Sequence, residues 1–333
     1  MVDSSVDKEQ IKQVILFLDS KEVRIAIILT NLQKAQGQAL DIILAYSTTP
    51  QNRELFHGTD ICKILLRLLP EGNSVRIASC LINFSADKDY VKELISLNVS
   101  TRVFDFLKTN VKMDMKSPEQ TSAHFLEDDN AYVIRDSSNQ DISQAIEQLL
   151  MMLSNVTINE EGQRHLLGTG ATKGAILDNL FGMFCYFGSS GNFDFISNVL
   201  SNVSALKEGR NYMLENKMLQ KLVELLKGNK INSHRRIHLI ECIRNIVFEY
   251  EPYEKLFIAN TKNLLDTLML LANSEELLKQ MDKLNLVEAL DKVYSKNVDD
   301  IEVQVQVLKN QIASLGMPKT EDDDEEEWKN DFD

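Results

Sequence analysis

The sequence predicts an all-α protein built from repeated helical units, and three observations support this prediction. The first is a motif, Leu-Ser-Asn-Val-Thr at 153–157, that returns as Leu-Ser-Asn-Val-Ser at 200–204, 47 positions later. The second is its recurrence with variation, as Leu-Ile-Asn-Phe-Ser at 81–85 and Ile-Arg-Asn-Ile at 243–246. The third is composition: 5 Pro and 13 Gly are few for 333 residues, and no alternating β-branched runs lie between turn residues.

The spacing of the motif indicates the kind of repeat. Asn245 follows Asn202 by 43 residues, whereas Asn155 follows Asn83 by 72. A polar stretch at 111–140, roughly 30 residues long, interrupts the longer interval, and its removal leaves about 42. Helical units of about 40–47 residues are typical of armadillo and HEAT repeats, in which each unit buries its apolar face against its neighbours. We therefore predict one armadillo/HEAT-like right-handed α-solenoid over residues 1–316, with 111–140 as a surface insertion loop.

The helices of this array can be placed from their apolar positions and boundaries. Apolar residues on one face predict helices at 11–18 and from about residue 21, which close the N-terminal end of the array. A helix at 41–47 follows, with Ala45 at the Asn position, and Ser74 is expected to cap the helix that carries Asn83. Further helical segments are expected at 59–69, 142–167, 175–187, 192–205, 208–215, 218–227, 233–250, 264–271, 275–281, 286–294 and 298–315.

The Asn at the centre of each motif is the first candidate for binding a partner. An Asn at one repeat position places a row of amides along one surface, and each amide both donates and accepts hydrogen bonds. Such a row can hold an extended peptide backbone, or each amide can instead bond a neighbouring repeat and aid stacking. Both interpretations stay open from the sequence. We expect the four side chains to line one concave surface: Asn83, Asn155, Asn202 and Asn245.

Four arginines near the last two motifs form a second candidate site, namely Arg210, Arg235, Arg236 and Arg244. Together they can present a basic surface to an acidic segment of a partner. The alternative is an ordinary solvated helix face. We expect reversal of the charge at Arg235, Arg236 and Arg244 to weaken partner binding without unfolding the protein.

No pattern in the sequence supports catalysis, a cofactor or a metal site. The Gly-rich stretch at 168–174 lacks a Gly-Lys pair followed by Ser or Thr, and no strand leads into it, so we interpret it as a helix-connecting turn. His234 and His238 are one helical turn apart, as metal ligands can be, but no third ligand accompanies them in the sequence. The 4 Cys stand singly within apolar patterns, which indicates reduced, buried thiols.

The charge distribution separates the body of the chain from its C-terminal end. The formal charge is −14, of which residues 321–333, with nine acids and one Lys, contribute −8. The body is only mildly acidic, which argues against nucleic-acid binding, and no stretch is long and apolar enough to indicate a membrane span. We expect 317–333 to be a disordered acidic tail that confers solubility, or that docks Trp328 and Phe332 into a basic groove of a partner.

The order of the motifs resembles a known family. It is similar to the order found in a eukaryotic armadillo cochaperone family. The similar segments are Val-Arg at 75–76 before the motif at 81–87, the motifs at 153–157 and 200–204, and Arg235-Arg236 before 243–249. The Leu-rich stretch at 264–271 is similar to that family's C-terminal module. Two features depart from the family: only six residues separate Phe257 from Leu264, where a long acidic segment is usual, and Glu275-Glu276 replaces Gly-Arg.

The resemblance implies a function. Members of that family assist the folding of translation elongation factor 2 and bring it to the ring-shaped cytosolic chaperonin. We therefore expect a cytoplasmic, monomeric, non-enzymatic adaptor without a cofactor, whose client contact lies in the C-terminal half. The alternative is an importin-like carrier of extended peptides, in which Asn rungs normally alternate with Trp; the chain has 1 Trp, in the tail.

Overall fold

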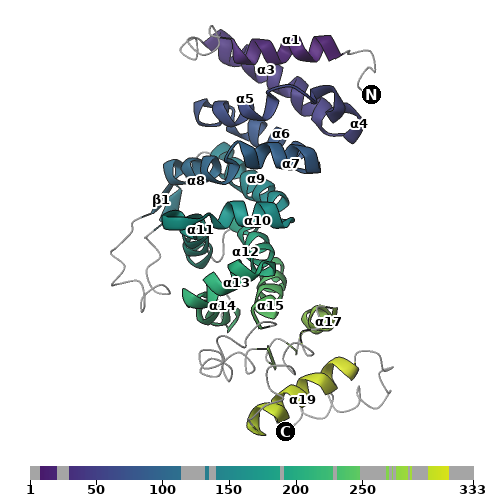
Figure 1. The fold of residues 1–333 in the computed structure, drawn as a ribbon, viewed down its shortest axis with the longest axis vertical. Helices are drawn as coiled ribbons and strands as arrows, with labels where there is room; N and C mark the ends of the chain where they lie inside the picture. The colour runs from purple at the N-terminus through teal and green to yellow at the C-terminus, as the bar shows by residue number, and fades with distance from the viewer. Residues whose placement is uncertain are drawn as a thin grey trace, which may run out of the picture.

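The computed structural model describes residues 8–20, 30–113, 132–134, 140–187, 191–227, 231–247, 268–269, 272, 275–283, 286 and 299–314. These residues are helical apart from turns and one pair of short strands, so the all-α prediction is confirmed. The helices follow one another in chain order along the long axis of the molecule, from α1 (Lys8–Asp19) to α19 (Asp299–Ser314) (Figure 1).

One series of helices carries the repeated motif, and we call its members the motif helices. Each motif helix packs against the next one along the chain, so that a continuous row forms. The series extends further toward the N-terminus than the sequence predicts, because its first helix begins at Thr30 and not near Asp41. The motif helices are α3 (Thr30–Ser47), α6 (Ser74–Ser85), α9 (Gln140–Val156), α12 (Ile196–Ala205) and α15 (Ser233–Val247).

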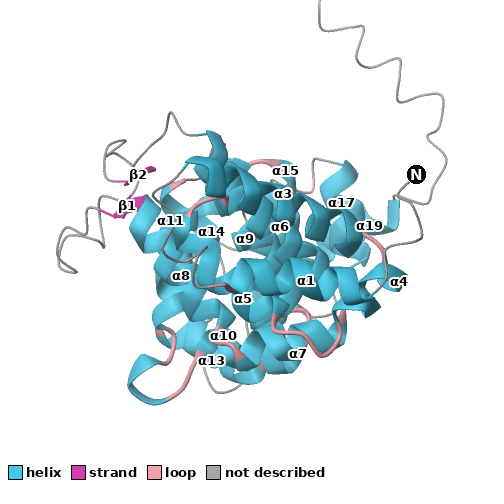
Figure 2. Ribbon diagram, turned by 90° about the horizontal axis from the view of Figure 1, so that it is seen from above, coloured by secondary structure: helices cyan, strands magenta, loops and turns pink. Residues whose placement is uncertain are grey.

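Two further helices precede each motif helix after the first. The first of the two is α4 (Pro50–Arg53), α7 (Lys88–Ser96), α10 (Glu160–Leu167) or α13 (Lys207–Glu215). The second is α5 (Ile61–Leu68), α8 (Val99–Asn110), α11 (Ala175–Tyr186) or α14 (Met218–Lys227). Figure 2, a view along the long axis, shows α7, α10 and α13 on one side of the motif helices, and α8, α11 and α14 on another.

The helices share one continuous hydrophobic core. It runs from Ile11 through the apolar side of every motif helix to Leu308 in α19. The residue two positions before the motif Asn is buried in each of three units, because Leu81 and Leu153 show 0% and Leu200 shows 1% exposed surface. Between α15 and α19, helix α17 (Glu275–Lys283) contacts both. Each unit therefore buries its apolar faces against the units before and after it.

The chain turns sharply after each motif helix, and side-chain caps begin the next helix at three of these turns. Thr49, Asp87 and Asn159 each accept a hydrogen bond from a backbone N–H in the first turn of α4, α7 and α10. The prediction that Ser74 caps α6 is wrong. Ser74 is the first helical residue, and Asn73 before it adopts a left-handed backbone with φ 54°, from which its amide reaches Gln36.

The insertion begins and ends in a short pair of strands, which the sequence did not predict. β1 (Val111–Met113) pairs antiparallel with β2 (Tyr132–Ile134), with Val111 opposite Ile134. Val111 is 1% exposed and belongs to the core, so it anchors β1 to the helices. Three-residue strands carry too few positions to show the alternation that identifies a strand in a sequence.

Several predictions fall outside the described residues. These concern the helix from about residue 21 to 29, most of the segments at 264–271 and 286–294, and the tail with Trp328 and Phe332. The predicted loop at 111–140 is described only at its strands and at Gln140. Within the described part of the chain, the helices are all too short or too polar to cross a membrane.

Candidate partner-binding surface

The four motif asparagines lie in equivalent positions, and each bonds the preceding motif helix. The side-chain Nδ2 of each Asn donates to a Ser or Thr hydroxyl two residues beyond the Asn position of that preceding helix. We call this row of bonds the amide ladder. Its rungs are Asn83 to Ser47 Oγ at 2.9 Å, Asn155 to Ser85 Oγ at 2.9 Å, Asn202 to Thr157 Oγ1 at 3.1 Å and Asn245 to Ser204 Oγ at 3.0 Å.

The hydroxyl of each rung is oriented by its own helix. Each one donates its proton to a backbone carbonyl three or four residues earlier, which leaves its lone pairs to accept the incoming amide. These bonds are Ser47 to Leu44 O at 3.0 Å, Ser85 to Ile82 O at 2.7 Å, Thr157 to Leu153 O at 2.9 Å and Ser204 to Ser201 O at 2.6 Å. The recurring Asn-x-Ser/Thr pattern is thus a stacking pattern: Asn bonds backward and Ser or Thr receives the next unit.

The ladder ends where the pattern ends. Ala45 stands at the Asn position of α3, so α3 supplies a hydroxyl but no amide, and Val247 replaces the Ser or Thr after Asn245.

The sequence left two interpretations of the Asn row open, binding of a partner peptide and stacking of the repeats. The contacts support stacking for the amide N–H groups. Among the described residues, the Oδ1 atoms of Asn83, Asn155 and Asn202 accept no hydrogen bond, so a role in holding a partner backbone stays a prediction for these oxygens.

Breaking one rung is expected to destabilise the protein measurably. Replacing Asn202 by Ala removes the donor to the hydroxyl of Thr157, a fully buried residue, and to the carbonyl of Ser154. The free energy of unfolding should fall by about 1–3 kcal/mol, because these buried acceptors lose a hydrogen bond. Urea unfolding of Asn202→Ala, Thr157→Val and the double variant gives their coupling free energy, expected at about 0.5–3 kcal/mol. Simple additivity of the two losses would show that the rung does not stabilise the stack.

Arg235 does not face a partner, and this corrects the expectation from the sequence. Its side chain is 0% exposed and its Nε donates to Asp194 Oδ1 at 2.5 Å, while its guanidinium carbon lies 4.9 Å from the centroid of the Phe184 ring. Burial lowers the pKa of the Arg235 guanidinium, and the hydrogen bond and charge of Asp194 oppose that shift. Reversing the charge at Arg235 would therefore disrupt folding, contrary to the prediction from the sequence.

The other three arginines are half-buried and each contacts the backbone or a neighbouring amide. Arg210 donates to Ser204 O at 3.0 Å, at the C-terminal end of α12. Arg236 Nε donates to Ile231 O at 3.2 Å, and Arg244 donates to Asn245 Oδ1 at 2.9 Å. Each residue is partly exposed, so their proposed role in binding a partner stays a prediction.

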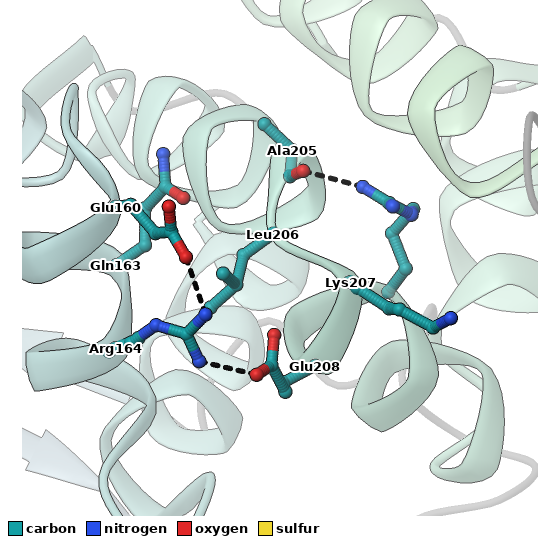
Figure 3. Close-up of a pocket in the computed structure, with 8 residues that line it drawn as sticks. Glu160, Gln163, Arg164, Ala205, Leu206, Lys207 and Glu208 are labelled. Carbon is teal, nitrogen blue, oxygen red and sulfur yellow. Dashed lines mark hydrogen bonds and ion pairs between the residues drawn. The ribbon is translucent and has the colours of Figure 1, made fainter.

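An open pocket of about 340 Å³ lies between the first turns of α10 and α13 (Figure 3). Arg164 reaches across it, bonding Glu160 on its own helix and Glu208 on α13. The hydrogen bond from Arg164 is the main cause that lowers the pKa of Glu208. The pocket thus contains an ion-pair link between neighbouring units. It is lined by Glu160, Gln163, Arg164, Ala205, Leu206, Lys207, Glu208 and Arg210.

The Gly-rich turn at 168–174 packs one unit against the next. Gly174, with φ +79°, lies against Tyr212 of α13, and a Cβ there would come within 1.8 Å of the tyrosine ring. The Tyr212 hydroxyl donates to Asp178 Oδ2 at 2.7 Å in α11. The geometry therefore gives this turn a packing role.

Two histidines and two further side chains form a polar cluster between α12 and α15. His234 Nε2 lies 2.9 Å from Asn198 Oδ1, and His238 Nε2 lies 2.9 Å from Asn198 Nδ2. His238 Nδ1 lies 3.3 Å from Glu241 Oε2. The sequence indicated only the histidine pair. Asn198 could not be found from the sequence, because it is 40 residues from His238 along the chain. Glu241 was also missed, although it stands only three residues after His238.

The thiols lack the character of nucleophiles. Cys62, Cys80 and Cys242 are buried and Cys185 is half-buried, as free thiols. Burial is the main cause that raises the pKa of Cys80, Cys185 and Cys242 to about 12. These three groups therefore remain protonated at neutral pH.

Comparison with known proteins gives a family and a similar fold. The chain is similar to a solved structure described as an engineered protein, Northeast Structural Genomics Consortium Target OR329, with a TM-score of 0.51. At 13% identity, over 93% of this chain and 99% of that one, the likeness concerns the fold alone. No curated protein matches the chain. A family model described as "Domain of unknown function (DUF383)" matches residues 138–306, about half of the chain, and the protein therefore belongs to the DUF383 family.

Proposed function

We propose that this protein is an armadillo-type, right-handed α-solenoid that acts as a non-enzymatic adaptor in the cytoplasm. The amide ladder is the observation that carries the proposal, because it joins successive units through one repeated contact. Solenoids built in this way offer long surfaces to partner proteins. The proposal includes the expectation that the motif helices line a concave surface.

We further propose that the adaptor is a folding cochaperone that brings newly made translation elongation factor 2 to the cytosolic chaperonin. Support comes from the ordered motifs at 75–87, 153–157, 200–204 and 235–249, which resemble that cochaperone family. The described residues also include Arg244, which donates to Asn245 of the last rung, and the half-buried Arg236 on the same helix. We place the client contact there, without the buried Arg235.

Capture from a eukaryotic lysate tests this function. Immobilised full-length protein is expected to retain both elongation factor 2 and chaperonin subunits, identified by mass spectrometry. The Arg236→Glu/Arg244→Glu variant should retain at least about 10-fold less elongation factor 2, a loss of about 1.4 kcal/mol in binding, with unchanged circular dichroism. Arg102→Glu, a charge reversal at an exposed helical position, is the matched control.

The outcomes separate the function from the placement of the site. Retention of neither protein by the wild-type chain would contradict the cochaperone proposal. Equal retention by the double variant and by Arg102→Glu would move the client contact elsewhere on the surface.

A second candidate function is that of an importin-like carrier for extended peptides. The observation that favours it is the row of Oδ1 atoms on Asn83, Asn155 and Asn202, which accept no hydrogen bond among the described residues. Against it, the Nδ2 atoms of these amides already bond the neighbouring helices, so the row can accept from a peptide backbone but not donate to it. The cochaperone function therefore remains our first proposal.

A further inference from the structure

The polar cluster between α12 and α15 brings two imidazoles to one amide. His234 and His238 lie one turn apart on α15, with ring centroids 4.8 Å apart. Their Nε2 atoms lie 2.9 Å from Oδ1 and from Nδ2 of Asn198, a residue of α12. Both Nε2 atoms therefore contact the same amide group between two neighbouring units.

The hydrogen bonds of His238 prepare its Nε2 as a ligand. Since Asn198 Nδ2 is a donor, His238 Nε2 accepts, and the ring proton sits on Nδ1, which donates to Glu241 at 3.3 Å. A histidine with one nitrogen on a carboxylate and a lone pair on the other has the usual arrangement of a metal-binding histidine.

Charged side chains face the histidine pair from both units. Asp194, just before α12, and Arg235 and Glu241, from α15 itself, are these groups.

We propose that His234, His238 and the side-chain oxygen of Asn198 bind a divalent first-row transition metal ion, of which Zn²⁺ is the representative. Two imidazoles, one amide oxygen and water suit Zn²⁺, Ni²⁺ or Cu²⁺ better than the oxygen-seeking Mg²⁺ or Ca²⁺. On binding, the His234 proton moves from Nε2 to Nδ1 and the Asn198 amide turns its oxygen inward, with no net release of protons. Within the described residues no three His, Cys, Asp or Glu side chains converge on one point, so the amide is needed as third ligand.

A metal at this position would join two successive units beside the last rungs of the amide ladder. Asn198 lies four residues before Asn202, and His238 lies seven before Asn245. The ion would therefore fix the distance between α12 and α15 at the surface next to the ladder. The proposal does not depend on the proposed cochaperone function.

Calorimetric titration of the full-length protein with ZnCl₂ at pH 7.5, in metal-free buffer, tests the site. We expect one equivalent to bind, and the affinity to fall at least about 10-fold in His234→Gln, His238→Gln and Glu241→Gln. Asn198→Asp should bind more tightly than wild type, because an anionic oxygen replaces a neutral one. His57→Gln, at an exposed histidine outside the cluster, should behave as wild type.

A thermal melt of each variant with and without ZnCl₂ separates a lost site from a lost fold. Zn²⁺ should raise the melting temperature of the wild type and not that of a folded His234→Gln/His238→Gln variant. The proposal is overturned if this double variant keeps the wild-type affinity and stoichiometry, or if the wild type binds no Zn²⁺. It is also overturned if Asn198→Asp weakens binding, since α12 would then not supply a ligand.

Discussion

Replacing Arg235 by Met is expected to lower the free energy of unfolding by about 3–5 kcal/mol, the usual result of leaving one member of a buried ion pair alone. The partner left behind is Asp194, which Asn232 Nδ2 also contacts at 2.8 Å. Because Asp194 keeps 19% of its side chain exposed, water compensates part of the loss, and we expect the lower end of this range. Urea unfolding followed by circular dichroism measures the change.

Two further variants show whether the pair itself is responsible. Arg102→Met, at an exposed position of α8, should change stability by no more than about 0.5 kcal/mol. Asp194→Leu combined with Arg235→Met should recover most of the loss, because two apolar side chains can replace a buried ion pair. If Arg235→Met alone is as stable as wild type, the ion pair does not support the contact between α12 and α15.

Replacing Gly162 or Gly209 by Ala is expected to lower the free energy of unfolding by about 3 kcal/mol or more. This is the upper end of the loss that added volume causes in a packed core. A Cβ on Gly162 would come within 1.8 Å of Val156 O, and one on Gly209 within 2.1 Å of Val203 O. The obstacle is backbone in both cases, and a carbonyl of a motif helix cannot rotate aside as a side chain would. The short helices α10 and α13 would have to move away from the preceding motif helix.

Gly37 supplies the matched control within the same protein. It is a buried glycine inside α3, but a Cβ there would meet only side-chain atoms, the nearest being Asn73 Oδ1 at 3.6 Å. Gly37→Ala should therefore stabilise the protein by up to about 1 kcal/mol, the helical advantage of Ala over Gly. Thermal and urea unfolding of the three variants compare these positions. Equal effects at Gly37 and Gly162 would show that the close approach of the units does not require glycine.

The repeated local pattern could be recognised without the structure. The recurrence of Asn-x-Ser/Thr, with Glu-Gly several residues later at 161–162 and 208–209, identified the repeat, its helices and its approximate boundaries. These features are readable because each depends on neighbours along the chain: helical periodicity, caps and glycine positions act over a few residues. From the sequence, the Asn row could either hold a partner peptide or bond the neighbouring repeat, and no feature of the sequence favoured one of the two.

The contacts of each polar side chain depend on how the helices pack. Arg235 and Arg236 are adjacent in sequence, yet α15 directs Arg235 into the core against Asp194, 41 residues away, and leaves Arg236 at the surface. Likewise Asn198 meets His234 and His238 only because α12 packs on α15. A side chain's partner across the stack depends on the rotation of one helix against the next. That rotation is set by the packing of whole helix faces, which no short stretch of sequence specifies.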